Sequence, residues 1–166
     1  LLIKGTWKFA QKLGYQVSEL EFPSIKIPKV PLRYLTAQEE TRLLIELAPD
    51  RECQGLKPMA ERSEELKRMM QDAYDLVILL LDTGARYSEI ANIEWQRIDL
   101  AEQTIHLWRS KVQNETVLYM TDRVFDVLTR RFETEDGQHV FRNRDGGARG
   151  YSTQSIRKAI TRAGLK

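Results

Sequence analysis

The sequence predicts a mainly α-helical domain that carries one small antiparallel β-sheet, an α+β fold. Two observations support this fold class. Apolar residues recur at helical spacing between residues 66 and 81, as they do in a helix that buries one stripe. Three short segments between residues 97 and 120 are rich in β-branched and aromatic residues, which is typical of strands.

Prolines mark a boundary between two predicted domains. Three of the five prolines fall within residues 21–33, where they remove backbone donors and fix φ. This segment is therefore predicted to be an extended linker. We assign residues 1–20, with a helix over residues 6–13, to the end of a preceding helical domain, and residues 34–166 to a second domain.

Helices dominate the predicted second domain. Thr36 and Glu39 form a capping box, in which each side chain satisfies a free backbone N–H of the first turn, and this predicts a helix to about residue 48. The apolar series over residues 66–81 predicts the central core helix. Gly84 suits its C-terminal cap, because glycine takes the left-handed conformation without strain. Further helices are predicted over residues 88–94, 121–132 and 152–163.

The predicted sheet lies between the central helix and the C-terminal quarter of the chain. Its strands are predicted over residues 97–100, 104–108 and 116–120. Turn-like stretches over residues 101–103 and 110–115 separate them, so neighbouring strands are expected to pair antiparallel. The longest uninterrupted apolar run has six residues, whereas a membrane-spanning helix needs about 20. A membrane location is therefore not expected.

Charge is polarised along the chain, although the net charge is only +2. Residues 36–103 hold 8 basic and 15 acidic residues, whereas residues 142–166 hold 7 basic residues and 1 acidic residue. A basic segment of this kind can bind a polyanion, because each cation that neutralises a phosphate releases a condensed counterion. The alternative interpretation is a solvated helix face rich in arginine.

The turn after the central helix holds a candidate catalytic arginine. Residues 82–90 read Asp-Thr-Gly-Ala-Arg-Tyr-Ser-Glu-Ile, and Arg86 is therefore held on a short segment behind a glycine. A guanidinium grips two oxygens of one phosphate in a fixed geometry. Glu89 follows one helical turn later and can orient Arg86. The alternative is an ordinary ion pair between these two residues, worth a few tenths of a kcal/mol.

This segment resembles the first arginine box of the tyrosine recombinases, the phage-integrase family. Residues 34–40 are similar to the opening of that family's catalytic domain, and residues 93–100 resemble its entry into the sheet. Residues 110–117 resemble the turn that presents the family's catalytic lysine. Residues 152–165 resemble its helix that ends in Ala-Gly. The resemblance runs from about residue 20 to the last residue and implies a tyrosine-recombinase catalytic-domain fold.

The resemblance implies a site-specific DNA recombinase or integrase. A tyrosine hydroxyl would attack the scissile phosphodiester and form a 3′-phosphotyrosine link. Arg86, supported by Glu89, would stabilise the charge on the non-bridging oxygens, and Lys111 would protonate the leaving 5′-oxygen. No metal, nucleotide or other cofactor is implied.

The same resemblance implies groups that these 166 residues do not supply. The family's His-x-x-Arg box and tyrosine nucleophile would lie beyond Lys166, so we expect an incomplete catalytic domain without cleavage activity. His139-Val-Phe-Arg142 fits the letters of the box but precedes a glycine loop, and Tyr151 lies ahead of the last helix. We interpret neither as catalytic. The alternative function is a truncated, non-catalytic module that binds DNA or a partner protomer.

Duplex DNA is the expected partner, together with protomers of the same recombinase in a tetrameric synapse. The single cysteine, Cys53, excludes a disulfide within the chain and favours a reducing compartment. Together with this, the resemblance implies a cytoplasmic protein of a bacterium, phage or mobile element that is associated with the nucleoid. The residues predicted to contact DNA are Arg142, Arg149, Arg157 and Lys158.

Overall fold

The computed structural model describes residues 2–18, 20–21, 33–53, 55–109, 114–134 and 137–165. The chain divides into two units, Leu1–Tyr34 and Leu35–Lys166. In the first unit, helix α1 spans Leu2–Lys12 and begins earlier than predicted, since no proline interrupts the residues before position 6. Residues 22–32 lie outside the described part, so the extended linker and the domain bounds stay predictions.

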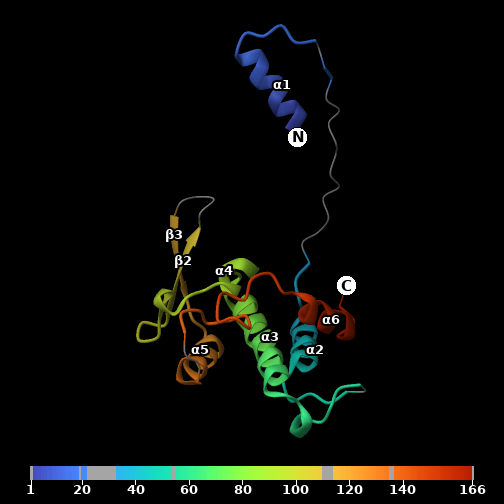
Figure 1. Ribbon diagram of the computed structural model, residues 1–166, viewed down its shortest axis with the longest axis vertical. Helices are drawn as coiled ribbons and strands as arrows, with labels where there is room; N and C mark the ends of the chain where they lie inside the picture. Colours follow the sequence, from blue (N-terminus) through green and yellow to red (C-terminus); the bar gives the residue numbers. More distant parts are fainter. Residues whose placement is uncertain are drawn as a thin grey trace. The chain divides into compact units, whose positions relative to one another are not determined.

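The second unit is mostly helical and carries one three-stranded antiparallel sheet, which confirms the predicted fold class (Figure 1). None of the helices in the described ranges is long and apolar enough to cross a membrane. The elements are α2 (Ala37–Leu47), the 3-10 turn η1 (Met59–Glu61), α3 (Glu64–Thr83), α4 (Tyr87–Ala91), the 3-10 turn η2 (Trp95–Arg97), β1 (Ile98–Asp99), β2 (Thr104–Arg109), β3 (Asn114–Tyr119), α5 (Asp122–Thr134) and α6 (Gln154–Arg162).

The caps predicted at Thr36 and Gly84 form as expected from the local sequence, and α5 also begins at a capping threonine. The Thr36 hydroxyl accepts the Glu39 N–H at 3.2 Å, and the Glu39 carboxylate accepts the Thr36 N–H at 3.0 Å. Gly84 closes α3 with φ at 62°, a left-handed conformation that favours glycine. Thr121 caps α5 by accepting the Val124 N–H at 3.2 Å.

The sheet forms where it was predicted, but its first strand is shorter. Strand β2 pairs with β3 over six residues, whereas β1 contributes only Ile98 and Asp99. The preceding residues pair with another segment, since the Trp95 N–H donates to the Gln138 carbonyl at 2.9 Å. The Ile93 carbonyl likewise accepts the Val140 N–H at 3.0 Å. These long-range bonds end α4 at Ala91 instead of residue 94.

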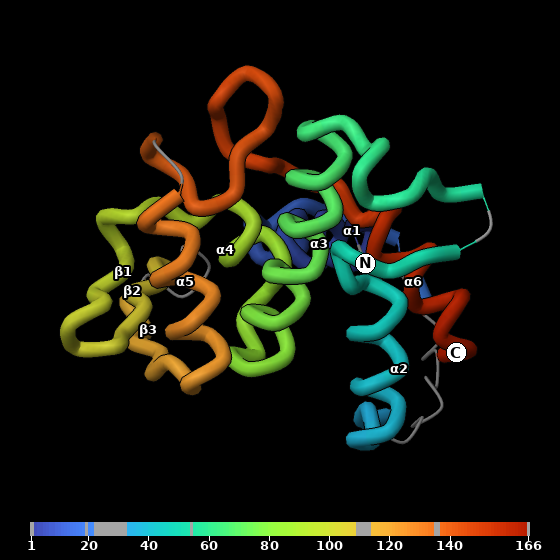
Figure 2. Tube along the Cα trace, turned by 90° about the horizontal axis from the view of Figure 1, so that it is seen from below, coloured from blue at the N-terminus to red at the C-terminus, as the bar shows by residue number. Residues whose placement is uncertain are grey.

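Helix α3 packs on both sides and forms the centre of the core. On one side, Leu76 and Leu79 belong to an apolar cluster with residues of β2, α5 and the segment around Phe141. On the other side, Ala73 and Val77 belong to a cluster with residues of α2 and α6. Figure 2 shows α5 and the strands on one side of α3, and α2 and α6 on the other. The turn that follows α3 is thereby anchored from two directions.

A buried charge cluster joins α3 to α5. The Arg131 guanidinium donates to Asp75 at 2.8 Å, to the Val140 carbonyl at 3.0 Å, and to Asp72. It also lies 4.4 Å from the centre of the Phe141 ring. Because buried charges are tolerated only when paired and hydrogen-bonded, these contacts position α5 on the central helix.

Candidate active site

Arg86 lies at the N-terminus of α4, directly after the turn that ends α3. The Thr83 hydroxyl donates to the Leu79 carbonyl at 2.5 Å and accepts the Ala85 N–H at 3.2 Å, which closes the turn. Arg86 itself has extended backbone angles, φ −72° and ψ 149°. The guanidinium is thus presented at a helix start that is attached to the core helix by a tight turn.

Glu89 holds Arg86 from one helical turn away. One carboxylate oxygen accepts the Arg86 backbone N–H at 2.8 Å, and the other lies 3.2 Å from the guanidinium. The Arg86 side chain nevertheless remains 64% exposed, whereas the Glu89 side chain is only 12% exposed. The ion pair suggested by the sequence is therefore present, and it leaves most of the guanidinium accessible to a ligand.

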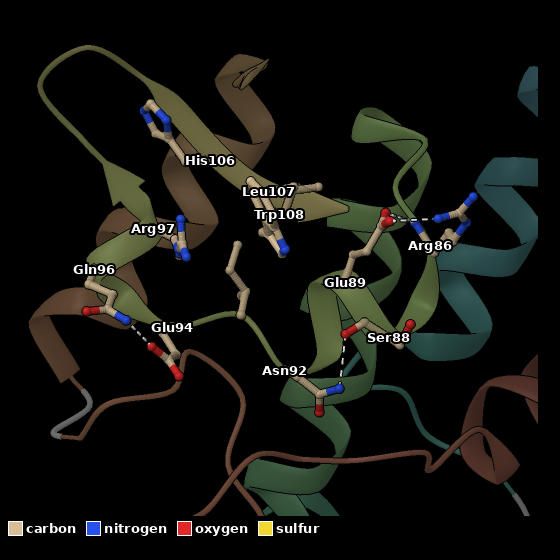
Figure 3. Close-up of a pocket in the computed structure, with 11 residues that line it drawn as sticks. Arg86, Ser88, Glu89, Asn92, Glu94, Gln96, Arg97, His106, Leu107 and Trp108 are labelled. Carbon is tan, nitrogen blue, oxygen red and sulfur yellow. Dashed lines mark hydrogen bonds and ion pairs between the residues drawn. The ribbon is translucent and has the colours of Figure 1, made fainter. Parts of the chain in front are cut away.

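A pocket of about 500 Å³ lies beside Arg86, between α4, η2 and β2. Figure 3 shows the Glu89 carboxylate turned toward Arg86 at one end, with Arg97 and His106 at the other. Arg97 pairs with Glu115 of β3 at 3.3 Å. The lining thus holds Arg86 and Arg97 at opposite ends together with two carboxylates, Glu89 and Glu94, and Arg86 has the more exposed of the two guanidinium groups.

Tyr87 of α4 and Asn92, the residue that follows α4, connect the Arg86 turn to residues 150–152. The Tyr87 hydroxyl donates to the Ser152 carbonyl at 2.8 Å and accepts the Ser152 N–H at 3.0 Å. The side-chain amide oxygen Oδ1 of Asn92 accepts the Gly150 N–H at 3.2 Å. Tyr151 meets the Tyr87 ring edge to face, with ring centres 5.3 Å apart. These contacts fix the orientation of α4 relative to the start of α6.

A second ion pair holds the end of α3 from the side of α5. Arg123 donates to both carboxylate oxygens of Asp82, at 3.1 Å for the longer contact, and the Thr121 hydroxyl donates to Asp82 at 2.6 Å. Arg123 also contacts Glu40 of α2 at 2.8 Å. The Arg123 hydrogen bond holds the pKa of Asp82 below its ordinary value, and Asp82 raises the pKa of Arg123. Both groups therefore stay charged at neutral pH.

The sequence profile of the phage integrase family matches residues 36–166. The chain belongs to this family. No curated protein matched the sequence. The Arg86 turn and the elements around it all lie within the matched residues, as the resemblance of residues 82–90 predicted.

Solved structures of tyrosine recombinases and integrases share this fold. The crystal structure of XerA recombinase is 20% identical, with a TM-score of 0.58 over 99% of this chain and 54% of that chain. The integrase from mycobacterium phage Brujita is 21% identical, with a TM-score of 0.55 over 98% and 49%. XerH recombinase bound to its difH substrate is 15% identical, with a TM-score of 0.63 over 99% and 46%. The chain spans about half the length of these structures.

Lys111, the predicted catalytic lysine of this phage-integrase-family chain, lies outside the described residues. The described parts of β2 and β3 end at Arg109 and begin again at Asn114, with six paired positions between the strands. The hairpin is therefore confirmed on both sides of residues 110–113, with β3 beginning two residues earlier than predicted, and the role of Lys111 stays a prediction.

The four predicted DNA-contacting residues have different surroundings. Arg157 and Lys158 are exposed on α6. Arg142 and Arg149 are partly buried in the segment before α6, and Arg149 lies 3.4 Å from the buried Asp72. The structure thus separates two exposed cations from two that also contribute to the fold, and their contacts with DNA remain predictions.

Sequence reasoning missed the residues that position the Arg86 turn. Tyr87 and Ser152 are 65 residues apart, and Asp82 and Arg123 are 41 apart. No local pattern links such pairs. A partial signal was present, because Asp82 and Tyr87 both lie within the arginine motif of residues 82–90.

Proposed function

We propose that the complete protein is a site-specific DNA recombinase that cleaves and rejoins strands through a 3′-phosphotyrosine intermediate. The observation that supports this most is the Arg86 guanidinium, which is 64% exposed and held by Glu89 beside a pocket in a member of the phage integrase family. A guanidinium in this arrangement can donate to two oxygens of one phosphodiester without first reorganising.

The proposed chemistry divides the transfer between three groups. A tyrosine hydroxyl, supplied by a segment beyond these 166 residues, attacks the scissile phosphorus and forms the phosphotyrosine ester. Arg86 stabilises the extra negative charge on the non-bridging oxygens as the bond to the 5′-oxygen breaks. Lys111 gives a proton to that departing oxygen. The 166-residue chain alone is then expected to form no covalent link with DNA.

Duplex DNA is the proposed partner. XerH was solved in a pre-cleavage complex with difH, and the Tn1549 transposon integrase in complex with circular intermediate DNA. Arg157 and Lys158 are exposed cations of α6 that can neutralise backbone phosphates. Assembly into a tetrameric synapse of identical protomers, and action in the cytoplasm at the nucleoid, are part of the same proposal.

A nicked suicide substrate tests the role of Arg86 in the complete protein. The substitution Arg86→Ala should lower the rate of covalent protein–DNA formation by roughly 10²–10³, because it removes a preorganised donor to the charge that develops in the transition state. The matched control is Arg42→Ala, which removes an exposed arginine of α2 outside the pocket.

Two results would contradict the proposal in different ways. If the Arg86→Ala variant cleaves DNA at the wild-type rate, Arg86 takes no part in the reaction. Tight DNA binding by the complete wild-type protein, without any covalent product, would instead support the alternative function of a non-catalytic DNA-binding module.

A further inference from the structure

A second pocket, with a volume of about 460 Å³, lies between the N-terminal half of α3, residues 142–152 and α6. It shares no lining residue with the pocket beside Arg86. Six arginines and one lysine line it, against only two acidic residues, Glu65 and Asp72. Cations gathered around one cavity repel one another unless an anion lies between them. The composition of the wall therefore favours an anionic ligand.

Arg149 forms a rigid part of this pocket. Its side chain is only 10% exposed and lies 3.4 Å from Asp72. The same carboxylate also accepts a hydrogen bond from the buried Arg131, so one negative charge faces two guanidinium groups. The Nε atom of Arg149 is buried without a hydrogen-bond partner among the described residues. Because Arg149 also lines the pocket, its guanidinium adds a positive charge to the wall at a position set by the fold.

Other cations around the pocket differ in whether a carboxylate neutralises them. Arg144 pairs with Glu65, and Arg162 pairs with Glu46 at 2.7 Å. Arg68 of α3 and Lys158 of α6 also line the pocket. Within the part of the chain that the structure describes, neither of these two has an ion-pair partner. Lys158 is exposed, whereas Arg68 also lines a neighbouring pocket with Glu64 and Glu65; among the described residues neither cation is held in an ion pair, so both can turn toward a ligand.

We infer that this pocket binds a phosphate group, at a site separate from the phosphodiester that Arg86 would hold. Arg149, Arg68 and Lys158 come from three different segments, and a tetrahedral phosphate presents oxygens toward donors on several sides. A carboxylate has two oxygens in one plane and would leave part of this set unmatched. The phosphate can belong to a DNA backbone or to a free phosphorylated molecule, since both offer the same oxygens.

Calorimetric titration of the chain with inorganic pyrophosphate at constant ionic strength tests the site. The double substitution Arg68→Gln/Lys158→Gln should weaken binding at least about tenfold, because it removes two charge-assisted contacts. The matched control is Arg42→Gln/Lys67→Gln, which removes the same charge from α2 and α3 outside the pocket lining. The control should stay within about twofold of the wild type. Circular dichroism would verify that both variants remain folded.

The absence of saturable pyrophosphate binding, or equal weakening in the two double variants, would overturn the inference. A competition experiment with duplex DNA separates the two phosphate sources. If the site takes a backbone phosphate, pyrophosphate will compete with DNA, and the pocket variant will bind DNA more weakly than the control. If it takes a free ligand, saturating pyrophosphate will leave the DNA affinity of the wild type unchanged, and any loss of DNA binding in the pocket variant will reflect only the contact proposed for Lys158 on α6.

Phosphate binding at the second pocket does not depend on the cleavage chemistry. The substitution Arg86→Ala should leave pyrophosphate affinity unchanged, because Arg86 lines the other pocket. A failure of the phosphate site therefore leaves the proposed recombinase activity intact, and a failure of that activity leaves the phosphate site intact.

Discussion

Arg86 and Arg131 are both held by carboxylates, but their surroundings are opposite. The Arg131 side chain is 2% exposed and donates to Asp72, Asp75 and a backbone carbonyl. The Arg86 side chain is 64% exposed and, among the described residues, pairs with the carboxylate of Glu89. The donors of Arg131 are thus used within the fold, whereas most of those of Arg86 face solvent. An arginine that is buried among several acceptors thus stabilises the fold, whereas an arginine that is mostly exposed keeps donors with which it can bind a phosphate.

The largest expected effect on stability comes from Arg131. The substitution Arg131→Met leaves two buried carboxylates without their main partner and should lower the free energy of unfolding by roughly 3–5 kcal/mol. Urea denaturation followed by circular dichroism measures this loss. The matched control is Arg130→Met, whose side chain is 44% exposed and also contacts Asp75; we expect a loss below about 1 kcal/mol. Equal losses in the two variants would show that burial does not determine how much each arginine contributes to the free energy of unfolding.

The ion pair of Asp82 and Arg123 should contribute less to stability than Arg131 and more than Arg86. Its two side chains are 10% and 39% exposed. Because Arg123 holds the pKa of Asp82 below the ordinary value of 3.8, the pair stabilises the fold at pH values above 3.8. Its contribution is lost as the pH falls through the lowered pKa of the folded state.

The substitution Asp82→Asn should therefore lower the free energy of unfolding by about 1 kcal/mol at pH 7, and the difference from the wild type should shrink below about pH 4. Urea denaturation at a series of pH values from 7 to 3 measures both effects. Asp126→Asn, at an exposed position of α5, serves as the control. A difference that stays constant with pH would contradict the electrostatic explanation.

The smallest expected effect on stability is that of Arg86 itself. The substitution Arg86→Ala removes one exposed ion pair at i, i+3, so the free energy of unfolding should change by less than about 0.5 kcal/mol. The same urea experiment measures it, beside Arg42→Ala. A loss of about 2 kcal/mol or more would show that Arg86 is a structural residue like Arg131, and would weaken its assignment as a phosphate ligand.

Local patterns predicted much of the fold because they depend on residues close together in the sequence. The capping box at Thr36, the left-handed Gly84 and the pairing of Arg86 with Glu89 each involve residues no more than three positions apart. Boundaries were less accurate at α4, since the backbone of residues 93–95 pairs with residues 138–140 instead of continuing a helix. Such competition depends on partners that a local pattern does not contain.

The sequence by itself determined the helical and strand segments, the position of the arginine in the turn after the central helix, and the resemblance that the family match confirmed. Only the tertiary structure decided which arginines are buried and which remain accessible. Arg131 and Arg149 are equivalent to any other arginine in the sequence until α3 brings Asp72 beside them. The physical reason is that the energy of a charge depends on its solvation and its neighbours in space, and these are set when distant segments pack together.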